Sequence, residues 1–80
     1  MEFSYDYFVK CILEGDEREF WYKDKIIIVS SSSKLNFIEV EYKGKIILKQ
    51  KFDTPQELLD NAAIDGMMLK ELWNELTLAD

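Results

Sequence analysis

Apolar residues at intervals of three and four mark the first element of the chain. They predict a helix over residues 3–14 with a single apolar stripe made of Tyr5, Phe8, Val9, Ile12 and Leu13. Ser4 stands where a helix N-cap belongs, and Gly15 is the residue type that most often follows a helix end. We therefore expect one amphipathic helix here, although the aromatic and β-branched content of the segment would also suit a strand.

A six-residue pattern occurs twice in the middle of the chain and predicts two β-hairpins. Tyr22-Lys23-Asp24-Lys25-Ile26-Ile27 recurs as Tyr42-Lys43-Gly44-Lys45-Ile46-Ile47, with β-branched and aromatic residues around a polar centre. Together the two hairpins predict a four-stranded antiparallel meander over residues 17–23, 26–31, 35–41 and 45–51. A serine run, Ser30–Ser33, connects the middle strands.

The side-chain pattern favours a three-residue loop in each hairpin. For the second hairpin this register places Val40 opposite Ile46 and Ile38 opposite Leu48 on one face, and Glu41 opposite Lys45 and Phe37 opposite Lys49 on the other. For the first hairpin it places Phe20 opposite Ile26, with Asp24 in the left-handed loop position.

On this register the sheet has an apolar face that the helices leave uncovered. Trp21, Ile27, Phe37 and Ile47 then look outward. Such a face is typical of a binding surface, either for a second copy of the chain in a homodimer, for another protein or for a ligand. The alternative is that a turn or a terminus of the same chain folds over it.

The last third of the chain has strong helix signals. Thr54-Pro55-Gln56-Glu57 combines a capping box with proline at the first helical position. A second stripe, Leu69, Leu72, Trp73 and Leu76, predicts another helix, which Asp65 could cap. We therefore expect a single α+β domain over residues 1–80: an N-terminal helix, the four-stranded meander, and two C-terminal helices packed on one face of the sheet.

The net charge of −6 is concentrated in the C-terminal segment, where residues 53–80 hold seven acids and one base. Glu57, Asp60, Glu71 and Glu75 form either a solvated helical surface or a surface that engages a basic protein partner. Direct nucleic-acid binding is disfavoured, because affinity for phosphates depends on clustered Lys and Arg.

The composition excludes several kinds of chemistry. The chain has no histidine and one cysteine, Cys11, which rules out a Ser-His-Asp triad and a Cys/His zinc site. We expect no catalytic residue, metal or cofactor, and no enzyme activity. No apolar run approaches the length of a membrane span and no signal-peptide pattern is present, so we expect a cytoplasmic protein without membrane contact. A small ligand remains an alternative, bound near Trp21 and the Ser30–Ser33 loop at a homodimer seam.

Short motifs along most of the chain resemble a family of small uncharacterised proteins of Firmicutes and their phages. The resemblance is carried by Gly15-Asp16-Glu17-Arg18-Glu19-Phe20, by Glu57-Leu58-Leu59, by Ile64-Asp65-Gly66 and by Leu69-Lys70-Glu71-Leu72-Trp73. It implies a bacterial or phage cytoplasm and assigns no biochemistry to any residue. In that context it suggests an inhibitor that occupies the surface of a nucleic-acid-handling partner, with carboxylates in place of phosphates.

Overall fold

The computed structural model describes residues 2–79 and begins with helix α1, Tyr5–Leu13. The Ser4 hydroxyl accepts a hydrogen bond from the Tyr7 N–H at 3.1 Å, which caps the first turn. Gly15 follows the helix with a φ of 86°, a conformation that glycine adopts without steric strain. The predicted N-terminal helix is therefore confirmed.

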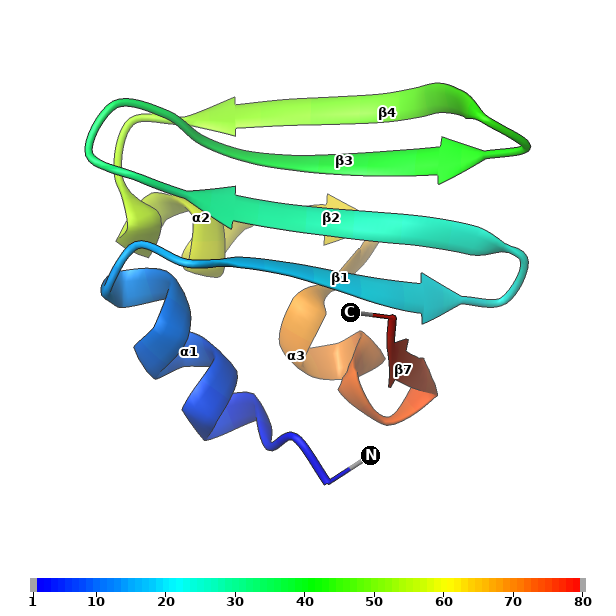
Figure 1. The fold of residues 1–80 in the computed structure, drawn as a ribbon, viewed down its shortest axis with the longest axis horizontal. Helices are drawn as coiled ribbons and strands as arrows, with labels where there is room; N and C mark the ends of the chain where they lie inside the picture. Colours follow the sequence, from blue (N-terminus) through cyan, green and yellow to red (C-terminus); the bar gives the residue numbers. More distant parts are fainter. Residues whose placement is uncertain (1, 80) are drawn as a thin grey trace.

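The next four elements are strands β1, Glu17–Tyr22; β2, Lys25–Ser31; β3, Asn36–Tyr42; and β4, Lys45–Phe52. They form the predicted antiparallel meander. A short strand near the C-terminus, β7, Leu76–Leu78, pairs with the free side of β1, so the sheet has the order β4-β3-β2-β1-β7. In Figure 1 the β3–β4 hairpin forms one margin of this sheet, away from α1 and α3.

The hairpin loops are shorter than we predicted. In the second hairpin Tyr42 pairs with Lys45, so the loop is only Lys43-Gly44, and these residues have φ values of 50° and 79°. Positive φ at both central residues is the geometry of a type I′ turn, which suits the twist of the strands. The register shifts after Glu41, which pairs with Ile46, so Ile47 is the extra residue of a β-bulge.

The first hairpin also has a two-residue loop. Tyr22 pairs with Lys25 and Phe20 with Ile27, and Lys23 takes the positive φ, 56°, that we assigned to Asp24. The predicted pairing of Phe20 with Ile26 is therefore wrong by one residue. Because successive side chains of a strand alternate between faces, this one-residue change exchanges the faces of Ile26 and Ile27.

The C-terminal segment confirms one of the two predicted helices. Helix α2, Pro55–Asn61, is capped by Thr54, whose hydroxyl accepts a hydrogen bond from the Glu57 N–H at 3.1 Å. The second helix is not continuous: a small hairpin, β5 (Ala63–Ile64) and β6 (Met67–Met68), leads to a single turn α3 (Leu69–Leu72), a 3₁₀ turn (Trp73–Glu75) and then β7. Asp65 and Gly66 both have positive φ, 54° and 76°, and form the turn of this hairpin.

The core lies between the helices and one face of the sheet, which we call the inner face. Phe20, Ile27 and Val40 on this face are at most 2% exposed and pack with Phe8 of α1 and Leu58 of α2 in the same cluster. Each such side chain contributes about 1.5–3 kcal/mol when it leaves water.

Trp73 joins the two ends of the chain. Its ring lies 5.0 Å from Phe8 and 5.3 Å from Phe20, centroid to centroid, and its indole N–H donates to the Phe3 carbonyl at 3.2 Å. The 3₁₀ turn is thereby held against the start of α1, which positions β7 beside β1.

Candidate interaction face

In residues 2–79, the buried side chains of α1, α2 and α3 lie on the inner side of the sheet, and these helices leave its second side, which we call the outer face, uncovered. Its side chains alternate along each strand with those that enter the core. They form three rows that run from β1 to β4: the Trp21 row (Trp21, Ile26, Glu41, Ile46), the Glu19 row (Glu19, Ile28, Glu39, Lys49) and the Glu17 row (Glu17, Ser30, Phe37, Lys51).

The largest exposed apolar groups of this face stand near opposite margins. Trp21 on β1 is 46% exposed, and Ile46 and Ile47 on β4 are 55% and 53% exposed. Ile26, Ile28 and Phe37 between them are half-buried. A free face with this much apolar surface is typical of protein interfaces.

Three of the four residues that we expected to look outward are on the surface. Trp21 and Phe37 belong to the outer face, and Ile47 is exposed at the bulge. Ile27 is a correction, because its side chain is 0% exposed in the core. The cause is the two-residue loop, which pairs Ile27 with the buried Phe20.

Sequence reasoning missed Ile26 and Ile28 and placed Ile46 on the buried face. Residues 25–31 contain apolar side chains at both alternating sets of positions, so nothing in β2 alone distinguishes its inner side from its outer side. The Lys43-Gly44 dipeptide was a usable signal, since glycine at the second position favours a two-residue turn.

Acidic and basic side chains lie toward opposite margins of the outer face. Glu17 and Glu19 lie on β1, whereas Lys49 and Lys51 lie on β4. Glu39, whose side chain is 13% exposed, forms an ion pair with Lys49 at 2.9 Å, and this ammonium group lies 4.8 Å from the Phe37 ring centroid. The outer face therefore carries acidic side chains on β1 and basic side chains on β4.

A hollow of about 320 Å³ opens at the end of the face between the two hairpin turns. Trp21 and Ile26 supply its apolar lining, and Asp24, Glu41 and Lys43 its charges. Asp24 is engaged with Lys25 at 3.2 Å. This hydrogen bond is the main cause of a lowered pKa of the Asp24 carboxyl, and the positive charge of Lys43 adds to it.

The four acids that we singled out in the C-terminal segment are exposed, but two of them have structural partners. Glu57 accepts a hydrogen bond from the Asp53 N–H at 3.1 Å, and Glu71 accepts from the Met68 N–H at 2.8 Å. Both carboxylates stabilise the starts of helices.

The other two acids have different surroundings. Asp60 accepts from the Gln56 amide at 3.0 Å. Burial of the Tyr5 ring raises the pKa of that phenol, and the charge of Asp60 adds to the increase. The Tyr22 hydroxyl raises the pKa of Lys23 by a hydrogen bond, with a smaller contribution from Glu75. Asp60 therefore has a hydrogen-bond partner, whereas Glu75 acts on Lys23 only through its charge.

The serine loop does not meet Trp21. A separate hollow of about 330 Å³ is lined by Ser31, Ser32 and Ser33 together with the end of α1 and the start of α2, and it shares no residue with the Trp21 hollow. The Ser31 hydroxyl donates to the Asn36 side-chain oxygen at 2.6 Å, which makes it part of the strand connection. The two parts of the proposed ligand site are therefore separated by the length of β2.

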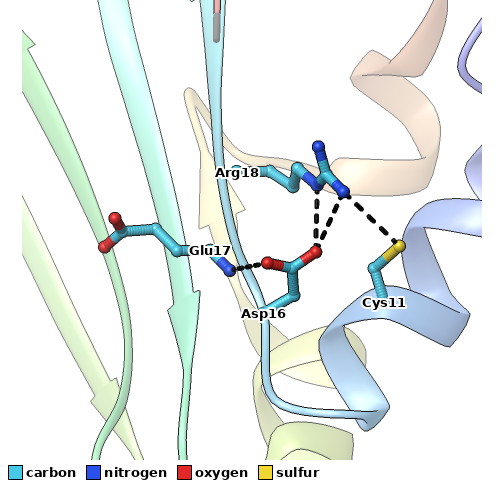
Figure 2. A network of polar contacts seen from close by, with 4 residues as sticks. All are labelled: Cys11, Asp16, Glu17 and Arg18. Carbon is cyan, nitrogen blue, oxygen red and sulfur yellow. Dashed lines mark hydrogen bonds and ion pairs between the residues drawn. The ribbon is translucent and has the colours of Figure 1, made fainter.

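A polar network ties α1 to β1 (Figure 2). The Arg18 guanidinium contacts the Asp16 carboxylate at 3.0 Å and lies 4.0 Å from the Cys11 sulfur, while Asp16 also accepts from the Glu17 N–H at 2.8 Å. In the sequence, the basic residue next to Cys11 is Lys10. The fold adds Arg18, but its charge is already matched by Asp16 and the thiol is buried, so we assign no reaction to this cysteine.

Two further observations apply to residues 2–79. No helix there is both long enough and apolar enough to cross a membrane. No group of three or more potential metal-ligating side chains occurs in this part of the chain.

Comparisons of the chain with protein-family models, with curated proteins and with solved structures find no match. The resemblance to small Firmicutes and phage proteins stays a prediction.

Proposed function

We propose that this chain is a non-enzymatic protein-interaction module whose binding surface is the outer face of the sheet. The observation that carries the proposal is the set of apolar side chains that the helices leave uncovered on this face, with Trp21, Ile46 and Ile47 about half exposed. Tryptophan is among the residues that contribute most at protein interfaces.

The charges define the chemistry of the partner. A complementary protein surface is apolar at its centre, basic opposite Glu17 and Glu19 on β1, and acidic opposite Lys51 on β4. An inhibitor that covers the working surface of another protein is one form of such a module. The outer face supports this proposal better than the C-terminal acids, because Glu57 and Glu71 are engaged by backbone N–H groups.

Photo-crosslinking in living bacterial cells that produce the protein tests the proposal. A benzophenone amino acid replaces Trp21 in one variant and Glu75 in a second, and a third carries it at Tyr7, an aromatic residue of α1 that is 52% exposed. We expect discrete protein adducts from position 21 and none above background from position 7. Adducts from position 75 alone would move the binding surface to the acidic segment, and equal yields at all positions would refute a specific face.

A further inference from the structure

We infer that the outer face is self-complementary and that its partner is a second copy of this chain, related by a two-fold axis parallel to the strands. This inference rests on the proposed function and specifies its partner. Homodimers generally have two-fold symmetry, so one surface patch must complement itself. The register of the three rows determines which residues of the two copies face each other.

An axis parallel to the strands, lying between the two sheets, reverses the order of the strands and preserves the rows. It places β1 of one copy over β4 of the other, and β2 over β3. Two sheets packed in this way keep their strands nearly aligned, which is a common arrangement of stacked sheets.

This axis brings oppositely charged side chains of β1 and β4 together. In the Glu17 row, Glu17 of one copy meets Lys51 of the other, and the same pair forms again on the opposite side. In the Glu19 row, Glu19 meets Lys49, which enters the interface already paired with Glu39. Glu17 and Lys51 are both exposed, and neither forms an ion pair among residues 2–79, so both are available to the second copy.

The same axis also brings exposed apolar side chains of the two copies together. In the Trp21 row, the half-exposed Trp21 ring of one copy meets Ile46 of the other, next to the exposed bulge residue Ile47. The axis that pairs unlike charges therefore also covers the most exposed apolar side chains of the face. Glu41, the acid of this row, lines the hollow together with Lys43.

The other two-fold arrangement that keeps the strands aligned is unfavourable. A two-fold axis perpendicular to the strands stacks each strand on its own copy and reverses the rows. It places Glu19 on Glu19 and Lys49 on Lys49, and like charges that face each other across an interface oppose association.

A charge exchange tests the inference directly. Sedimentation velocity measures dimerisation of the wild type and of two variants, Glu17→Lys and Lys51→Glu. The control is Lys34→Glu in the β2–β3 loop, because Lys34 is exposed and belongs to none of the rows. We expect each row variant to weaken the dimer by about tenfold and the control to leave it unchanged.

Mixing the two row variants should restore the dimer, because both contacts between positions 17 and 51 in the mixed dimer again pair a lysine with a glutamate. Native mass spectrometry of an isotope-labelled mixture should show the heterodimer in excess over both homodimers. A wild type that stays monomeric, or a dimer indifferent to both reversals, would overturn the inference. Adducts from position 21 with a different protein would then leave the proposed function standing.

Discussion

Replacing Lys43 by asparagine should raise the free energy of unfolding. Lys43 has a φ of 50° in the two-residue turn between β3 and β4. A lysine in the left-handed region costs about 1–2 kcal/mol, whereas asparagine tolerates it better, and Asn-Gly is a preferred sequence for a type I′ turn. The substitution also removes a contact in which the Lys43 ammonium lies 5.2 Å from the Tyr42 ring centroid. Such an exposed contact contributes about 0.5 kcal/mol.

The expected net gain is about 0.5–1 kcal/mol, or an increase in Tm of about 2–8 °C for a domain of this size. Urea unfolding at low, fixed protein concentration measures the gain without a contribution from self-association. Lys34→Asn removes the same charge from a residue without positive φ and should change stability little. A Lys43→Asn variant no more stable than the wild type would refute the two-residue turn and favour the three-residue loop that the side-chain pattern predicts.

Three further predictions concern the register, the helix start and the pH dependence. Ile27→Ala should lower the free energy of unfolding by about 2–5 kcal/mol, since Ile27 is fully buried, whereas Ile47→Ala should change it by less than about 0.5 kcal/mol; equal effects in urea unfolding would contradict the observed register. Glu71→Ala should cost about 1 kcal/mol because it removes the acceptor of the Met68 N–H, while Glu75→Ala removes the same charge at little cost; thermal unfolding of the two variants compares them. The pKa of Tyr5 is raised above its ordinary value of 10.0, so the folded state favours the neutral phenol. The neutral phenol's contribution to the free energy of unfolding is therefore complete below pH 10.0 and is lost as the pH rises through the pKa of the folded state. Tyr5→Phe should therefore show a smaller loss of stability between pH about 8 and about 11 than the wild type, and an identical loss would refute the assignment.

The parts of the fold that follow from local chemistry could be predicted from the sequence. The Ser4 and Thr54 caps depend on residues within one helical turn, and the four strands follow from runs of β-branched and aromatic residues.

The parts that depend on distant partners could not be predicted in the same way. Leu76 and Leu78 fall in a short segment whose strand conformation depends on pairing with Tyr22 and Phe20, more than fifty residues earlier. The helical spacing of Leu69, Leu72 and Leu76 could not reveal that partner.

The candidate face was only partly predictable, because its composition depends on how the strands pair. Trp21 and Phe37 were placed on the outer face correctly, but Ile27 was not, because one residue of loop length decides which side of β2 enters the core. That Glu17 on β1 and Lys51 on β4 lie in one row, with β2 and β3 between them, became visible only when the register of all four strands was known.

The most direct test of the self-complementary face locates the second copy at Trp21. A benzophenone amino acid at this position, irradiated in the purified protein, should give an adduct of twice the chain mass, and peptide sequencing should place the crosslink at Ile46 or Ile47 of the other copy. A crosslink to β1 of the other copy, or no dimeric adduct at a concentration where the chain is folded, would contradict the account.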